Sequence, residues 1–132
     1  MNTPAPLFKA LSIAALCAWL ASCATAPPTE PEPPEAPEQK ARMAELQGDY
    51  ARAANYWLQA AIAAVGTTSQ AYRLNAAEAW LESGDRDKAR TTLDDLQVDS
   101  LSPSDQQRYR LLRAELALAE GDIPGALYLV GQ

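Results

Sequence analysis

The sequence predicts an all-α fold of about three helix pairs over residues 39–132, and three observations support this prediction. From Gln39 onward the chain is rich in Ala, Leu, Arg and Glu, and its apolar residues recur with a helical period. The dipeptide Gly-Asp recurs at 48–49, 84–85 and 121–122, with spacings of 36 and 37 residues. A shift of 37 residues also aligns nine identical residues of the second and third units: Tyr72/Tyr109, Arg73/Arg110, Leu74/Leu111, Ala77/Ala114, Glu78/Glu115, Leu81/Leu118, Gly84/Gly121, Asp85/Asp122 and Ala89/Ala126. A period of this length is typical of stacked helix pairs.

Each unit carries signals for the ends of its helices. Glycine adopts the left-handed conformation that stops a helix, and the aspartate after it caps the next helix through its side chain. In the third unit, Ser102 followed by Pro103 is a strong signal for a helix start. Together these signals predict helices at residues 39–47, 51–65, 69–83, 86–97, 103–120 and 123–131.

Two positions of the repeat predict how the helices of a pair pack. A small residue lies five positions after each turn glycine, where two helices must approach closely: Ala53, Ala89 and Ala126. A bulkier residue lies four positions further on and is expected to fill the space: Trp57, Leu93 and Val130. Trp57 and Trp80 are accordingly interpreted as core residues rather than as ligand-binding residues.

This pattern resembles the tetratricopeptide repeat, in which stacked helix pairs form a solenoid. The Gly-Asp turn, the small residue after it and the bulky residue four positions later fit, whereas the early Trp and Leu-Gly and the closing Pro are missing. In such solenoids the first helix of each pair lines a concave groove. Glu78 and Glu115 take the same place in successive first helices, so they are candidate partner-binding residues. The alternative is that both lie on a solvated charged face.

The N-terminal residues 1–22 read as an export signal. One positive charge, Lys9, precedes an apolar run from Ala10 to Ala21, which is shorter than the ~20 apolar residues that a membrane span needs. The run ends in Leu20-Ala21-Ser22-Cys23, which resembles the lipobox of bacterial lipoproteins. An ordinary secretory signal with a chance cysteine is the alternative.

The lipobox resemblance implies a specific processing of this chain. The thiol of Cys23 would carry a diacylglycerol, cleavage would fall between Ser22 and Cys23, and the new amine would be acylated. Several acyl chains hold a protein firmly in a membrane. Because Ala24 stands where Asp favours retention in the inner membrane, the resemblance implies the periplasmic side of the outer membrane.

Residues 23–38 are expected to comprise the lipidated cysteine and a Pro- and Glu-rich tether that follows it. Residues 24–38 contain six Pro and four Glu and present no apolar face for a core. An extended polyproline conformation at ~3.1 Å per residue would give this segment a reach of roughly 45 Å. A Pro-rich ligand for an SH3-like domain is the alternative to a spacer.

Charge and composition argue against nucleic-acid binding and against catalysis. The net charge is -6, and phosphate backbones require a basic footprint. The chain has no His, and of its two cysteines Cys17 lies in the export signal and Cys23 is the expected lipid site. Asp94 and Asp95 are adjacent, and neighbouring residues on a helix point in different directions, so the two carboxylates are not expected to act as a pair. No enzyme activity, cofactor or metal is expected beyond the covalent lipid on Cys23.

Two stretches suggest a more specific family. Residues 109–122 with Gly125-Ala-Leu, and residues 72–81, resemble the N-terminal helical domain of the penicillin-binding protein activator lipoproteins. This resemblance implies an outer-membrane lipoprotein that docks on a class A penicillin-binding protein and activates peptidoglycan synthesis. The alternative is an adaptor lipoprotein of the pilotin or outer-membrane assembly type, which binds a partner peptide.

The chain departs from that activator family at its C-terminal end. Family members continue into a large α/β domain to which activation is ascribed, whereas this sequence stops at Gln132. Leu127, Leu129 and Val130 would then leave an apolar face, and solenoid ends normally need a polar cap. We therefore expect the chain to be the start of a longer protein. A third hypothesis places a ligand-binding or enzymatic domain beyond Gln132.

Overall fold

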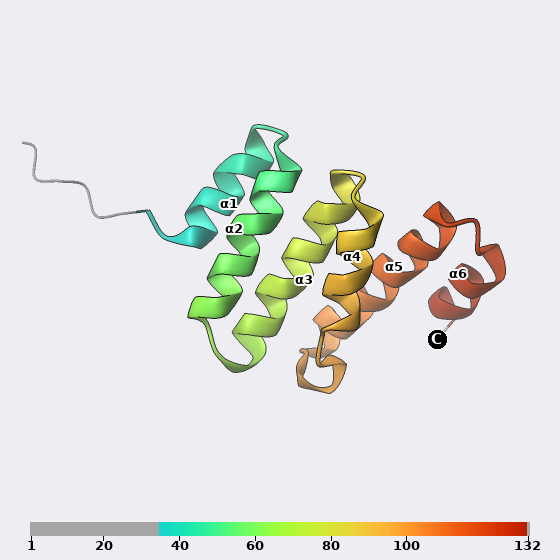
Figure 1. Ribbon diagram of the computed structural model, residues 1–132. Coiled ribbons are helices and arrows are strands. Elements are labelled where there is room, and N and C mark those ends of the chain that lie inside the picture. Colours follow the sequence, from blue (N-terminus) through green and yellow to red (C-terminus); the bar gives the residue numbers. More distant parts are fainter. Residues whose placement is uncertain (1–34, 132) are drawn as a thin grey trace, which may run out of the picture. The chain divides into compact units, whose positions relative to one another are not determined.

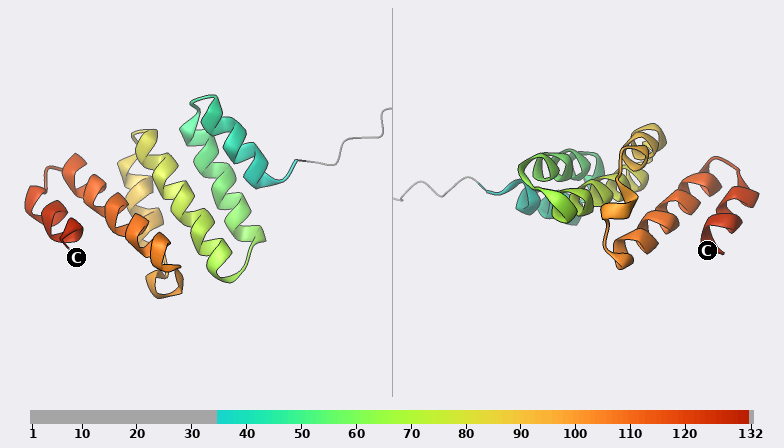
Figure 2. Two further views of the ribbon diagram at one scale, coloured as in Figure 1. Left: turned by 180° about the vertical axis from the view of Figure 1, so that it is seen from behind. Right: turned by 90° about the horizontal axis from the view of Figure 1, so that it is seen from below.

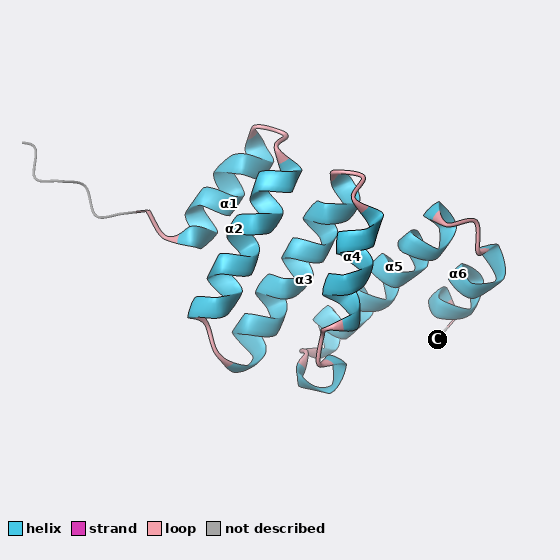
Figure 3. Cartoon of the chain, viewed as in Figure 1, coloured by secondary structure: helices cyan, strands magenta, loops and turns pink. Residues whose placement is uncertain are grey.

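The computed structural model describes residues 35–131, and this part of the chain is all-helical. It contains no strand among these residues (Figures 1 and 3). The elements in order are α1 (Pro37–Leu46), α2 (Tyr50–Ala63), α3 (Gly66–Glu82), α4 (Arg86–Asp94), the short 3-10 helix η1 (Val98–Ser100), α5 (Pro103–Ala119) and α6 (Ile123–Val130). The predicted all-α fold is confirmed for these residues.

The helices form three antiparallel hairpins, α1–α2, α3–α4 and α5–α6, which follow one another in chain order (Figures 1 and 2). The Gly-Asp turns close all three hairpins at the same end of the helices. The α2–α3 and α4–α5 connections lie at the opposite end. Helix α2 packs extensively on α3, whereas α5 packs on α3 and α4 over a smaller area.

The Gly-Asp turns have the predicted conformation in all three hairpins. The φ angles of Gly48, Gly84 and Gly121 are 73°, 81° and 86°. The amide of the following aspartate donates to a carbonyl in the last turn of the preceding helix, at 2.9, 3.0 and 2.8 Å in the three turns. This bond closes a Schellman motif, the usual way in which a left-handed glycine satisfies the free carbonyls of a helix end.

The predicted caps are also confirmed. The side chains of Asp49, Asp85 and Asp122 accept hydrogen bonds from backbone N–H groups three residues later, at 3.1, 3.1 and 3.0 Å. Ser102 caps α5 in the same way, with Pro103 in its first turn. Each cap satisfies an N–H group that would otherwise lack a partner.

Replacing Gly84 by alanine is expected to destabilise the fold by roughly 1–2 kcal/mol, because a Cβ atom makes the left-handed conformation unfavourable. An added Cβ would meet no atom within 4 Å, so the cost would be conformational rather than steric. Urea denaturation followed by circular dichroism measures the change. Gly131→Ala is the matched control, because Gly131 ends α6 with a φ of -79°. Equal losses from the two substitutions would contradict this account.

Alanines allow the helices to approach closely, and two apolar clusters fill the space between the hairpins. Ala53, Ala89 and Ala126 are buried as predicted. The first cluster centres on Trp57 and Trp80 and joins the first two hairpins. The second centres on Leu74 and Leu93, which pack with Leu96, Leu112 and Leu116 where the second and third hairpins meet. The prediction that Trp57, Trp80 and Leu93 are core residues is confirmed.

Val130 does not fill a core position as predicted, because its side chain is 62% exposed. Helix α6 packs on α5, and among residues 35–131 nothing packs against its other face. Leu127 and Tyr128 are exposed on the same helix, and Leu129 is half-buried. An apolar residue at a repeat position is buried only where a neighbouring helix covers it.

Four helix boundaries differ from the predicted ones by two or three residues, and the other differences are one residue or none. Helix α1 begins at Pro37 rather than at residue 39, so the expected tether ends two residues earlier; Pro suits the first turn of a helix. Helix α2 ends at Ala63 rather than at residue 65. Helix α3 begins at Gly66 instead of residue 69. Helix α4 ends at Asp94 instead of residue 97, because the chain turns there to bury Leu96 and Leu101.

Candidate protein-binding groove

A hollow of about 680 Å³ opens on the side of the hairpins formed by their first helices. We call it the first-helix groove. Helices α1, α3 and α5 supply most of its lining, and α2 supplies two aromatic residues. Its lining residues are Arg42, Glu45, Leu46, Tyr50, Trp57, Asn75, Glu78, Ala79, Glu82 and Arg108. The volume lies within the ~300–1,000 Å³ range of ligand pockets.

Trp57 organises the α1 side of the groove. Its indole Nε1 donates a hydrogen bond of 2.6 Å to Glu45, and the Arg42 guanidinium carbon lies 5.4 Å from its ring centroid. Its ring also stacks on Tyr72 at 5.5 Å. The Tyr72 hydroxyl donates to Glu38, and this hydrogen bond, together with burial, raises the pKa of Tyr72. Two carboxylates and one guanidinium of α1 are thus held by aromatic residues of α2 and α3.

Arg108 connects α5 to α3 across the groove. Its guanidinium donates to the Asn75 amide oxygen at 3.1 Å and forms an ion pair with Glu78. A longer contact of 3.5 Å joins it to Asp105 on its own helix. The ion pair with Arg108 constrains the orientation of the Glu78 side chain, which remains exposed.

The two glutamates predicted from the repeat have different surroundings. Glu78 lines the groove and is paired with Arg108. Glu115 is exposed on α5 and is not among the residues that line the groove. Equivalent places in the repeat therefore do not give equivalent sites. Cys23 and Ser22, predicted for lipidation and cleavage, lie outside the described residues 35–131. The expected export signal and most of the expected tether, residues 1–34, lie outside them too.

Sequence reasoning missed Arg42, Asn75, Glu82 and Arg108 as groove residues. The repeat gave little indication of a role for Arg108, because the second unit has Ala71 at the position that corresponds to Arg108. Arg42 was detectable in principle, since it lies six residues before the turn glycine, as Glu78 and Glu115 do in the later units.

A second hollow, of about 560 Å³, lies between α2 and α4 over α3. Trp80 contributes to it, and the Lys88 ammonium lies 4.3 Å from the Trp80 ring centroid. Leu58 and Ile62 of α2 form its apolar side. This hollow is less charged in its lining than the first-helix groove, and Lys88 is already paired with Asp85 at 2.7 Å.

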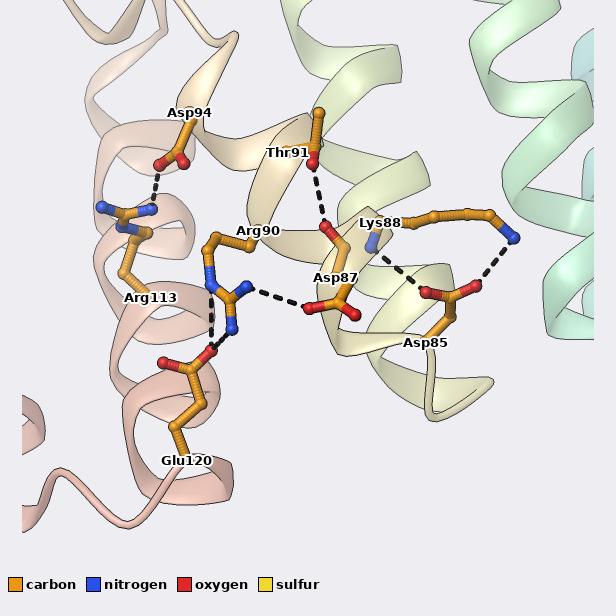
Figure 4. Close-up of polar contacts among 8 residues, drawn as sticks. All are labelled: Asp85, Asp87, Lys88, Arg90, Thr91, Asp94, Arg113 and Glu120. Carbon is orange, nitrogen blue, oxygen red and sulfur yellow. Dashed lines mark hydrogen bonds and ion pairs between the residues drawn. The ribbon is translucent and has the colours of Figure 1, made fainter.

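Ion pairs join the second and third hairpins along α4 and α5 (Figure 4). Arg90 of α4 pairs with Glu120 after α5 and, at 3.0 Å, with Asp87 on its own helix. Arg113 of α5 pairs with Asp94 of α4. The hydrogen bond to Glu120, followed by that to Asp87, raises the pKa of Arg90.

Asp85, in the turn of the second hairpin, makes the stability of the fold depend on pH. Hydrogen bonds from the Lys88 side chain and then from its backbone N–H lower the pKa of the Asp85 carboxyl. A lowered pKa in the folded state means that the ionised carboxylate stabilises the fold above the unfolded-state pKa of about 3.9. This contribution disappears as the pH falls through the lower folded-state value.

Asp85→Asn is therefore expected to lower the melting temperature at pH 7 and to lower it less as the pH falls below about 4. Thermal melts by circular dichroism at pH 7, 5, 4 and 3 measure the difference between the two proteins. Asp99→Asn serves as the control, since Asp99 lies in the 3-10 helix η1 and its carboxylate makes no ion pair among residues 35–131. A difference for Asp85→Asn that grows on acidification would contradict the prediction.

Within residues 35–131, no group of three or more His, Cys, Asp or Glu side chains is placed to hold a metal ion. Among the same residues, no helix combines the length and the apolar character that crossing a membrane requires.

Comparison with known proteins found no matching family, no matching curated protein and no matching solved structure.

Proposed function

We propose that this chain is an outer-membrane lipoprotein whose tetratricopeptide-like helix pairs bind a partner protein in the first-helix groove. The partner that the sequence favours is a class A penicillin-binding protein, which the lipoprotein would activate. The observation that carries the binding role is the groove itself, because it spans the first helices of all three hairpins.

The repeated geometry supports the solenoid part of this proposal. All three hairpins share the same glycine turn, the same aspartate cap and a buried alanine five residues after the glycine. Solenoids bind partners on extended surfaces that successive repeats build together. A groove lined by α1, α3 and α5 is such a surface.

The lining of the groove suits binding better than chemistry. Tyr50 is aromatic and half-buried, and Leu46 is apolar and exposed, which are features of protein-binding surfaces. Most of the charged side chains are held in place by neighbours before any partner arrives. Such preorganisation lowers the entropic cost of binding.

The lipobox and the Pro-rich segment support delivery of the groove to a partner away from the membrane. The lipid on Cys23 would fix one end, and residues 24–36 would hold the helices off the membrane at ~3.1 Å per residue. Docking would then shift the synthase towards its active state, if the lipoprotein binds that state more tightly than the inactive one. The support for a synthase as partner is the resemblance of residues 72–81 and 109–122 to the activator lipoproteins.

An adaptor of the outer-membrane assembly type is the second candidate. One observation favours it: the groove is an open hollow lined by apolar and charged side chains, which suits a short extended peptide. Both candidates use the same groove and differ in the partner.

Photo-crosslinking in living cells tests the proposal and separates the two candidates. Benzoylphenylalanine at position 46 is expected to form an adduct that mass spectrometry identifies as a class A penicillin-binding protein. Val65 is the matched control position, because it is 87% exposed, against 81% for Leu46, but lines neither hollow. An adduct with an outer-membrane assembly protein would support the second candidate. Equal adducts at both positions, or none at position 46, would overturn the use of this groove.

A further inference from the structure

Two charged side chains in the first-helix groove, Arg42 and Glu82, form no ion pair and no hydrogen bond within residues 35–131. Arg108 is bound to Glu78 and Asn75, Arg42 lies over Trp57, and Glu45 accepts from Trp57. The Glu82 carboxylate is exposed, and it is the one groove carboxylate without a bound donor among the described residues. Glutamates outnumber arginines in the lining by three to two, so the net charge that the groove presents to a partner is negative.

An exposed apolar residue lies at the same end of the groove as Glu82. Leu46 and Glu82 each lie two residues before a turn glycine, Gly48 and Gly84, and all the Gly-Asp turns are at one end of the helices. Leu46 is 81% exposed, which is more than any other apolar residue that lines the groove. Tyr50, at the start of α2, lies beside the same turn.

We propose that the groove binds a basic, apolar segment of the partner protein, with a lysine or arginine at Glu82 and an aliphatic side chain on Leu46. This inference rests on the proposed function, because it specifies the chemistry of the segment that the groove receives. The groove lining carries two arginines and three glutamates, a net charge of -1, and the whole chain carries -6. Charge complementarity therefore favours a cationic segment.

The same argument excludes the chain's own Pro- and Glu-rich segment as the occupant. Residues 24–36 contain three glutamates and no lysine or arginine, so they would bring only negative charge to Glu82. Like charges placed against each other weaken association. A segment from another protein is the occupant that fits.

Fluorescence anisotropy with defined peptides tests this proposal. The probe is the fluorescein-labelled, C-terminally amidated peptide Gly-Ser-Lys-Leu-Lys-Gly-Ser, and the comparison peptide has Glu in place of both Lys. The protein is the full lipidated chain in neutral detergent, with empty micelles as the baseline. We expect the lysine peptide to bind, the glutamate peptide not to bind, and added salt to weaken the complex.

Substitution of Glu82 assigns the binding to the groove. Glu82→Gln is expected to weaken binding of the lysine peptide by about 1.5- to fivefold, the range of one exposed ion pair. Glu115→Gln is the matched control, because Glu115 is also an exposed glutamate on a first helix but lies outside the groove. Identical thermal melts of the two variants establish that both are folded.

The proposal would be overturned by equal or tighter binding of the glutamate peptide, or by equal effects of the two substitutions. Failure of the lysine peptide to bind would also overturn it. The crosslinking test at position 46 reports separately on the groove. A partner adduct there, without binding of the lysine peptide, would leave the proposed function in place and refute only the basic segment.

Discussion

Replacing Trp57 by alanine is expected to destabilise the helical part of the chain by roughly 3–5 kcal/mol, the usual cost of removing a buried aromatic residue. The Trp57 side chain is 1% exposed and lies in the cluster that joins the first two hairpins. Its loss would also remove the stacking on Tyr72 and the donor to Glu45. Single domains are stable by only ~5–15 kcal/mol, so this one substitution is expected to unfold a large share of the molecules near body temperature.

Urea and thermal denaturation, followed by circular dichroism, measure the effect of Trp57→Ala. Trp57→Phe is expected to lose less stability, because the phenyl ring retains part of the packing but not the N–H donor. Tyr128→Ala is the control: this aromatic residue is 68% exposed on α6, so its removal should change the stability by less than about 0.5 kcal/mol. Similar losses for Trp57→Ala and Tyr128→Ala would show that the first cluster does not hold the hairpins together.

The features that the sequence predicted well are local ones. Each Gly-Asp turn depends on residues within one turn of helix on either side: the glycine provides the left-handed conformation, and the aspartate caps the next helix. The start of α5 at Ser102-Pro103 is local for the same reason. Such signals do not depend on how the hairpins pack, so they can be recognised without a structure.

The features that the sequence did not predict depend on contacts between hairpins. Arg108 binds Glu78, thirty residues away in the chain, and the repeat gives no sign of this pair because the second unit has Ala71 at the matching position. The end of α4 at Asp94 is set by the burial of Leu96 and Leu101 further along the chain. Val130 matches Trp57 and Leu93 in the repeat but is exposed, whereas they are buried. Burial at this position depends on whether a neighbouring helix covers the side chain. The repeat thus predicts the hairpins, whereas the groove and the set of charged side chains that line it follow from how the hairpins pack.

Replacing Cys23 by serine is expected to abolish lipid attachment completely, because the hydroxyl of serine does not form the thioether to diacylglycerol that the lipobox resemblance implies at this position. Intact-mass measurement of the purified protein, together with labelling by a palmitate analogue, detects the loss of the acyl chains. Under the proposed function, the helical part would then have no lipid to hold it at the outer membrane. If the groove acts on a membrane-facing partner, the crosslink from position 46 should fall sharply in the same variant.

The chain provides its own control in Cys17, which lies in the same apolar run but would leave with residues 1–22. Cys17→Ser is expected to leave the mature mass and the lipid label unchanged. Loss of the label in both variants would point to a general defect in export rather than to attachment at Cys23. A label that persists in Cys23→Ser would refute the lipobox, and with it the tether, because residues 24–36 would then have no membrane anchor from which to extend.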